Sequence, residues 1–174
     1  MTTIYFNYAF ITQLRYIRQP DSIKDSSCPF RSWKWLSSLF MTAILWETVI
    51  CSVYWSILYP DDRARLEGKV GANIWNCLDH AFPFIFLCTD WCLNRIYFEA
   101  NQVYANIFVF LIYGLVNLTY TFVKGEPVYP PISWDSVGSW ILGLSMLPLA
   151  LLYYFIIYYL TKCKFRCMKM HDSI

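Results

Sequence analysis

Residues 73–90 read NIWNCLDHAFPFIFLCTD, and this stretch decides the expected fold. With its apolar flanks it is long enough to cross a bilayer, which takes about 20 predominantly apolar residues in a helix. It nevertheless contains His80, which follows Asp79 and precedes Asp90 by ten positions. An ionisable side chain in hydrocarbon costs at least about 2.5–3.5 kcal/mol, so it normally faces a partner or a water-filled cavity. The stretch therefore predicts a membrane helix that carries a polar site.

The composition of the whole chain supports a membrane protein. Hydrophobic residues make up 57% of the sequence and charged residues only 15%, and the apolar residues come in blocks of about 20. A net charge of +2, with basic residues at the ends of the blocks, does not favour a nucleic-acid partner. Cys88/Cys92 and Cys163/Cys167 each lack the second pair that a structural zinc site needs. We expect no metal and no cofactor.

The apolar blocks predict an all-α fold, an integral membrane helical bundle of about four transmembrane helices. The predicted spans are 36–59, 72–93, 104–123 and 137–160, within a bundle that covers residues 36–160. Residues 1–35 are predicted to be a cytoplasmic segment with an N-terminal interfacial helix that ends at Pro20, and residues 161–174 a basic cytoplasmic tail. Pro60 is expected to end the first span, and Pro148 to kink the last one.

The distribution of basic residues predicts the topology. Four spans place both termini on one side of the membrane. Ten Lys and Arg residues lie on that side and four on the other. Because cytoplasmic segments carry the excess of Lys and Arg, both termini are expected in the cytoplasm.

The polar residues of the second span share one helix face. At about 100° per residue, an arc of similar width contains Asn73, Asn76, His80, Asp90 and Asn94. Measured from the middle of each span, Ser52 and Asn117 lie at nearly the same depth as His80. The loop 128–130 would cover this level from the non-cytoplasmic side. The sequence thus predicts that an imidazole, a hydroxyl and an amide meet inside the bundle.

Two interpretations of this cluster remain open. Histidine, with an ordinary pKa of about 6.5, could act as general base for the Ser52 hydroxyl, and Asn117 could donate to an oxyanion. Alternatively, His80 and Asn117 are interhelical hydrogen-bonding groups, and Ser52 is a small residue that allows close packing of helices.

Three motifs in order carry a resemblance to a known family. They are residues 53–59 (VYWSILY) at the end of a span, His80 with Asp90 ten residues later, and Gly125 followed by Val128-Tyr129-Pro130. Together they cover about residues 36–160. The chain resembles the androgen-induced and androgen-dependent TFPI-regulating proteins, to which the insect protein rolling stone is related. Family members are six-span proteins of internal membranes or the plasma membrane, so this chain looks like a shortened member.

The resemblance implies an activity. Family members that have been studied look like intramembrane threonine hydrolases, which cleave fatty acid esters of hydroxy fatty acids with a Thr and a His. His80 matches the family histidine. The family threonine follows a Ser-Trp-Lys-aromatic-Leu run, and the matching hydroxyl here is Ser37, after SWKWL at 32–36.

The sequence leaves two functions from different classes. The first is a membrane hydrolase of lipid esters, with His80 as base, Ser52 or Ser37 as nucleophile and Asn117 as oxyanion donor. The second is a non-catalytic membrane protein, a lipid-binding or assembly subunit with a structural polar core. Both make the bilayer and its lipids, or a lipid ester, the expected partners. The sequence identifies no protein partner.

Overall fold

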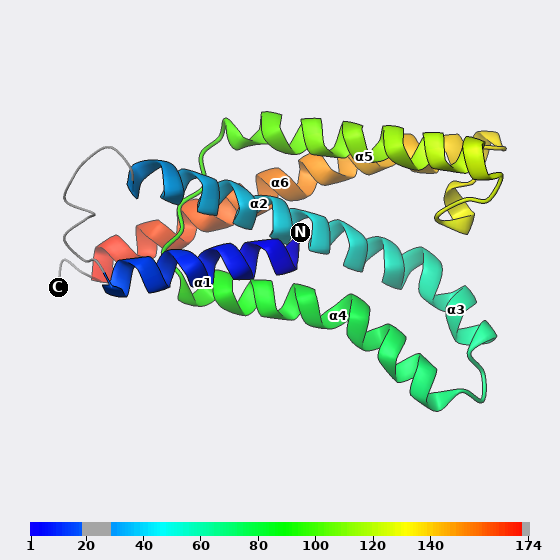
Figure 1. The fold of residues 1–174 in the computed structure, drawn as a ribbon, viewed down its shortest axis with the longest axis horizontal. Helices are drawn as coiled ribbons and strands as arrows, with labels where there is room; N and C mark the ends of the chain where they lie inside the picture. Colours follow the sequence, from blue (N-terminus) through cyan, green and yellow to red (C-terminus); the bar gives the residue numbers. More distant parts are fainter. Residues whose placement is uncertain (19–28, 172–174) are drawn as a thin grey trace. The chain divides into compact units, whose positions relative to one another are not determined.

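The computed structural model describes residues 1–18 and 29–171, and these are overwhelmingly helical (Figure 1). No strand occurs within those two ranges, so the predicted all-α class is confirmed. The predicted helix end at Pro20 lies outside the described residues. Two compact units can be distinguished, Met1–Cys51 with Leu66–Phe98 and Ser52–Arg65 with Glu99–Ile174. Each is described separately below.

The first unit is built from three helices, α1 (Thr2–Arg18), α2 (Pro29–Val53) and α4 (Val70–Leu93). The N-terminal helix α1 runs beside α2 and α4 (Figure 1). Its Tyr5 is 2% exposed and stacks on Phe40 of α2, with 4.7 Å between ring centroids. Phe40 also contacts Phe98, which follows α4. Large aromatic side chains therefore form the centre of this unit, together with the fully buried Leu87.

The second unit contains two long antiparallel helices, α5 (Gln102–Lys124) and α6 (Val137–His171), which lie side by side (Figure 1). It also contains the π-helix η2 (Tyr54–Leu58), the helix α3 (Tyr59–Arg65) and the 3₁₀ turn η3 (Pro130–Ile132). Helix α5 ends at Gly125, whose φ of 72° is the left-handed conformation that glycine adopts without a Cβ clash. The segment 125–136 then connects α5 to α6.

Three helical stretches are long and apolar enough to cross a membrane, within the part of the chain that the structure describes. They are Lys34–Leu58, Gln102–Lys124 and Val137–Met168, and they coincide with three of the four predicted spans. The remaining predicted span, at 72–93, forms α4, but its Asn, Asp and His side chains lower its hydropathy and it does not join this group. A helical bundle with three candidate spans is therefore shown. The membrane-spanning role of residues 72–93 and the interfacial position of α1 stay predictions.

Two helical segments continue past the residues at which the sequence predicted the first and last spans to end. The helical run of α2 and η2 continues into α3, where Pro60 is the second residue. Proline removes one backbone N–H donor from this run, and the helix changes from the π form to the α form next to it. Helix α6 contains Pro148 and continues to His171, so most of the predicted basic tail is an extension of the last helix.

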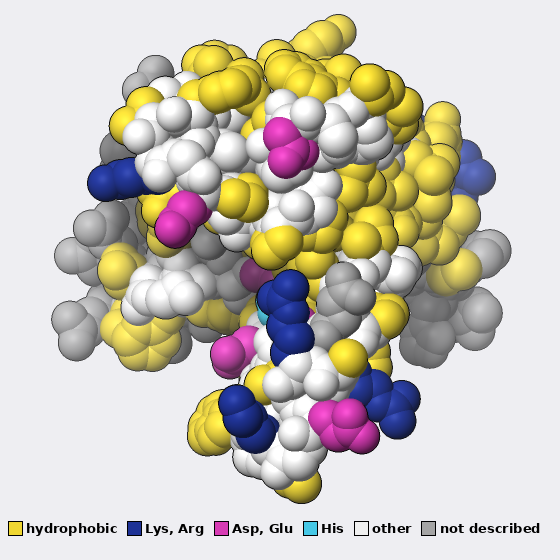
Figure 2. Space-filling view, turned by 90° about the vertical axis from the view of Figure 1, so that its right-hand side faces the viewer, with side chains coloured by type: hydrophobic (Ala, Val, Ile, Leu, Met, Phe, Trp, Pro, Cys, Tyr) yellow, Lys and Arg dark blue, Asp and Glu magenta, His cyan; other side chains and the backbone are white. Residues whose placement is uncertain are grey.

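Charged and apolar side chains are segregated on the surface. In Figure 2, Lys and Arg side chains gather, together with acidic ones, around the turn between α3 and α4, whereas α5 exposes large apolar side chains along its length. Arg63 and Arg65 close α3, and Lys69 precedes α4. Such a division between a charged turn and apolar helix sides is expected where helices leave a bilayer.

Candidate functional site

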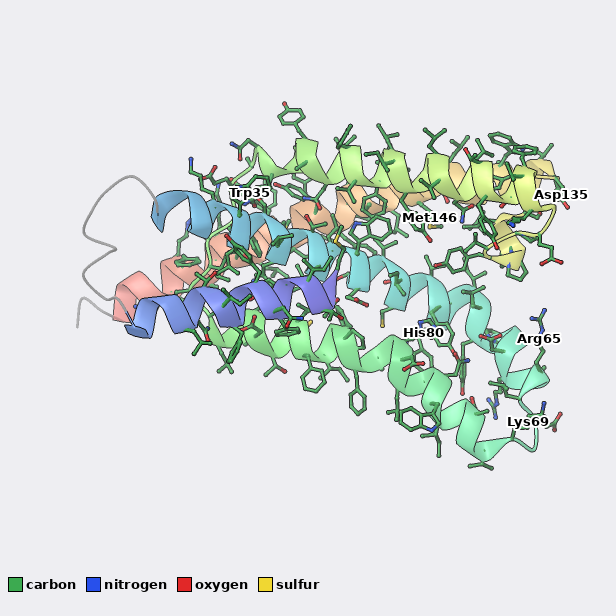
Figure 3. All side chains as sticks on the ribbon, in the orientation of Figure 1. Trp35, Arg65, Lys69, His80, Asp135 and Met146 are labelled. Carbon is green, nitrogen blue, oxygen red and sulfur yellow. The ribbon has the colours of Figure 1, made fainter. Side chains whose placement is uncertain are left out.

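His80 lies in the first half of α4, toward the turn that contains Lys69 (Figure 3). Its side chain is half-buried, whereas the preceding Asp79 is exposed. Neighbouring residues on a helix point about 100° apart, which explains this difference. Asp79 is therefore directed away from His80 and does not complete a catalytic triad with it.

Two acidic residues inside apolar helices accept hydrogen bonds from α1. Thr2 donates its hydroxyl to Glu47 of α2, and Tyr5 donates its phenol to Asp90 of α4. Thr2 and Tyr5 are three residues apart and thus lie on the same face of α1. Both carboxylates are half-buried, where an acceptor without a donor costs free energy, so these two bonds lower that cost and attach α1 to both neighbours.

The sequence interpretation missed this role of α1, because residues 1–35 were assigned to the cytoplasmic side. The sequence signal for this role was the three-residue spacing of Thr2 and Tyr5, which places both hydroxyl donors on one face of α1. One donor, Tyr5, sits among apolar residues that face α2. An interfacial helix does not need a buried tyrosine, and the carboxylates of Glu47 and Asp90 each needed a donor.

We expect Tyr5→Phe to lower the stability of the first unit by about 1 kcal/mol, because the ring still packs on Phe40 but the hydrogen bond to Asp90 is lost. Thermal unfolding of the full chain in detergent micelles measures the effect. Tyr8→Phe on the same helix is the control, since the Tyr8 hydroxyl makes no hydrogen bond to the described residues. Equal loss in both variants would contradict the assignment.

The structure does not bring Ser37 to His80. Ser37 donates its hydroxyl to the backbone carbonyl oxygen of Tyr97, at 2.7 Å. Ser37 lies about one helical turn before Phe40, in the direction away from Glu47. Phe40 stacks on Tyr5, whose hydroxyl binds Asp90, so Phe40 and Asp90 lie at about the same level of the unit. Ten residues of α4, about 15 Å along its axis, separate Asp90 from His80. Ser37 therefore connects α2 to the segment after α4.

Ser52 belongs to the second unit and lies two residues before the π-helix begins at Tyr54. Tyr153 of α6 donates its hydroxyl to Ser52 Oγ at 2.8 Å. The neighbouring Tyr154 donates to the backbone carbonyls of Glu99 and Ala100. Adjacent tyrosines of α6 thus hold two different segments of this unit. Single π-helical turns inside longer helices are frequent at functional sites.

Asn117 is buried in α5, with 5% of its surface exposed, and its side-chain oxygen accepts a hydrogen bond from Trp134 Nε1 at 2.8 Å. One helical turn earlier, the Tyr113 hydroxyl donates to that of Tyr129. These two bonds attach the segment between α5 and α6 to α5. The loop at Val128–Pro130, which the sequence predicted as a lid, is therefore held against its own helix.

Trp134 is the most unusual residue of this region. Its φ of 60° lies in the left-handed conformation, which costs about 1–2 kcal/mol in a residue with a Cβ. Three contacts offset this cost. Its indole N–H binds Asn117, its carbonyl oxygen accepts from Trp140 Nε1, and its ring covers Gly143 of α6. We refer to Trp134, Asn117, Trp140 and Gly143 as the tryptophan lock.

The described residues contain no group of three or more His, Cys, Asp or Glu side chains that could hold a metal ion. The absence of a metal site remains a prediction from the sequence. Cys77, Cys88 and Cys92 of α4 carry free thiols, as do Cys51, Cys163 and Cys167.

No protein-family model, no curated protein and no solved structure matches this chain. Over residues 1–18 and 29–171 the structure therefore defines a class, a helical protein with three candidate membrane-spanning helices and buried polar residues that connect its elements.

Proposed function

We propose that this chain is a non-catalytic multi-pass membrane protein, a lipid-binding or assembly subunit whose polar residues fasten its own helices. The observation that supports the proposal most is that its polar side chains form hydrogen bonds to other segments of the same chain. Glu47 and Asp90 accept from α1, Ser37 donates to a carbonyl after α4, and Asn117 accepts from Trp134. All of these bonds join separate segments.

Such bonds have a clear purpose in a membrane protein. Lipid tails are as apolar as the side chains that face them, so the hydrophobic effect does little to hold spanning helices together. Packing and interhelical hydrogen bonds take over, each bond contributing roughly 0.6–2 kcal/mol. A polar residue in a span can therefore be retained for assembly alone.

The surface of α5 favours the same proposal. Only 17% of the most apolar 18-residue stretch of α5 is buried, and the exposed side chains are large and apolar. They include Phe108, Leu111, Leu115, Val116 and Phe122, each more than half exposed. An apolar surface of this size suits acyl chains or the apolar helix of another subunit. Membrane lipids are accordingly the partners that we propose first.

The full-length protein in detergent micelles, treated with a fluorophosphonate probe, tests the absence of an activated hydroxyl. We expect no labelling under conditions in which an active membrane serine hydrolase, added as positive control, is labelled. Labelling that disappears in Ser52→Ala and falls in His80→Ala would overturn the proposal and establish a hydrolase.

A lipid-ester hydrolase is the second candidate, and the surroundings of Ser52 favour it. This serine meets the Tyr153 phenol two residues before the π-helical turn, so a second hydroxyl lies close to the candidate nucleophile. The base would be His80, by the depth comparison made on the sequence. The Trp134 indole binds the side-chain oxygen of Asn117, whereas the donor in this scheme would be the NH2 group of the same amide. The resemblance to the androgen-induced proteins belongs to this second candidate.

A further inference from the structure

The C-terminal part of α6 extends beyond what a bilayer needs. The helix Val137–His171 has 35 residues, which at 1.5 Å each is about 50 Å. The hydrocarbon core is about 30 Å thick. Several turns of α6 therefore lie outside the hydrocarbon if this helix spans a membrane.

The position of Lys162 marks where the helix leaves the hydrocarbon. Between Val137 and Leu160 the helix has no charged residue, and Lys162 is the first. Its ammonium group lies 4.6 Å from the centroid of the Tyr158 ring, a cation–π arrangement. Tyrosine and lysine are both typical of the headgroup region. Residues 163–168 thus follow immediately outside the boundary.

Two exposed thiols occupy this position. Cys163 and Cys167 are both exposed, and four residues on a helix bring them to within about 40° of the same face. Lys164 and Arg166 lie between them. Basic residues next to a span attract the anionic cytoplasmic leaflet, which keeps this helical turn close to the membrane surface. The thiols are thereby held at headgroup depth.

We propose that Cys163 and Cys167 are sites of S-acylation by a long-chain acyl thioester of coenzyme A. Such a donor inserts its acyl chain into the bilayer, so its thioester carbonyl lies at headgroup depth as well. The cysteine sulfur attacks that carbonyl, the new thioester C–S bond forms and the bond to coenzyme A breaks. Coenzyme A leaves as a thiol with the proton that the cysteine lost, and nothing is oxidised or reduced. Juxtamembrane cysteines are the usual substrates of this modification.

The full chain, expressed in cells that are fed an alkyne fatty acid, tests the proposal. After click labelling, we expect a signal on the protein that neutral hydroxylamine removes, because hydroxylamine cleaves thioesters. The signal should fall to background in the Cys163→Ser/Cys167→Ser variant. Serine is nearly the same size and both positions are exposed, so gel filtration should show the same elution volume for variant and wild type.

Two control variants sharpen the result. Cys92→Ser removes another exposed thiol near a helix end, but the last turn of α4 contains no basic residue, so we expect unchanged labelling. Replacing Lys162, Lys164 and Arg166 together by Gln leaves both thiols in place and should reduce labelling several-fold.

Three outcomes would overturn the proposal. They are an unlabelled wild-type protein, a signal that persists in the double serine variant, and reaction of Cys163 with a membrane-impermeant maleimide added outside intact cells. The last outcome would place the C-terminal end of α6 on the side opposite to the acyl thioester pool.

Discussion

Replacing Gly143 by alanine is expected to lower the free energy of unfolding by about 1–3 kcal/mol, the usual cost of forcing extra volume into a packed site. A Cβ at this position would lie 2.7 Å from Cζ3 of Trp134 and still closer to Cη2. The ring cannot retreat easily, because its N–H is bound to Asn117 and its backbone carbonyl to Trp140. Thermal or denaturant unfolding of the full chain in micelles provides the measurement.

Gly138→Ala is the matched control for this experiment. Gly138 lies in the same helix, and an added Cβ there meets nothing within 4 Å. We expect no loss of stability, since alanine is the better helix former. The double variant Gly143→Ala/Trp134→Ala should lose little beyond Trp134→Ala alone, because the clash partner is gone. Full additivity of the two losses would show that Trp134 does not cover Gly143.

Asn117→Leu is expected to destabilise the protein by a comparable amount, about 1–3 kcal/mol, because it leaves the indole N–H of Trp134 without its acceptor. Leucine branches at the same carbon as asparagine but is larger, so the loss does not come from a cavity, and the double-mutant cycle separates the hydrogen bond from overpacking. Trp134→Phe removes the donor from the other side. In a double-mutant cycle the pair should show a coupling energy of at least about 0.5 kcal/mol.

The control for this cycle is Tyr120→Phe on the same helix, where the side chain is 47% exposed. We expect its loss of stability to be smaller than that of Asn117→Leu, because no buried donor is left without an acceptor. If Asn117→Leu unfolds at the wild-type temperature, the hydrogen bond between α5 and the segment at Trp134 does not stabilise the protein.

The losses of stability expected for the Gly143 and Asn117 variants have the same physical origin. Trp134 holds an unfavourable backbone conformation, and the tryptophan lock is what compensates it. Variants of Gly143 and Asn117 should therefore be non-additive, since each weakens the placement of the same ring. A combined loss smaller than the sum of the single losses is the expected result.

Much of the fold could be predicted because hydrocarbon imposes strong demands on a sequence. Apolar blocks of about 20 residues specify helices, since every backbone polar group in lipid must be bonded within its own segment. The predicted spans at 104–123 and 137–160 correspond to α5 and α6, and Gly125 marks the end of α5 as a C-terminal glycine should. Helix periodicity also placed Asp79 away from His80.

The partners of the polar residues could not be predicted in the same way. Depth in the membrane and position around the helix indicate that a polar side chain needs a partner. They do not identify the partner, because many residues lie at the same depth. Asn117 was paired with His80 on this basis, whereas its side-chain oxygen accepts from Trp134, a loop residue with no place in a depth comparison. Asp90 was placed on the polar face of its span without a named donor, and α1 supplies that donor.

The sequence by itself determined that this protein is helical, that its helices are apolar enough for a membrane, and that a few polar groups inside them need partners. Those properties follow from local composition, because burial in lipid or in a core acts on each residue separately. Only the tertiary structure decided which groups meet. It bound Tyr5 to Asp90 and Trp134 to Asn117, contacts that join residues 85 and 17 positions apart. Such contacts depend on packing geometry, which no single stretch of the chain contains.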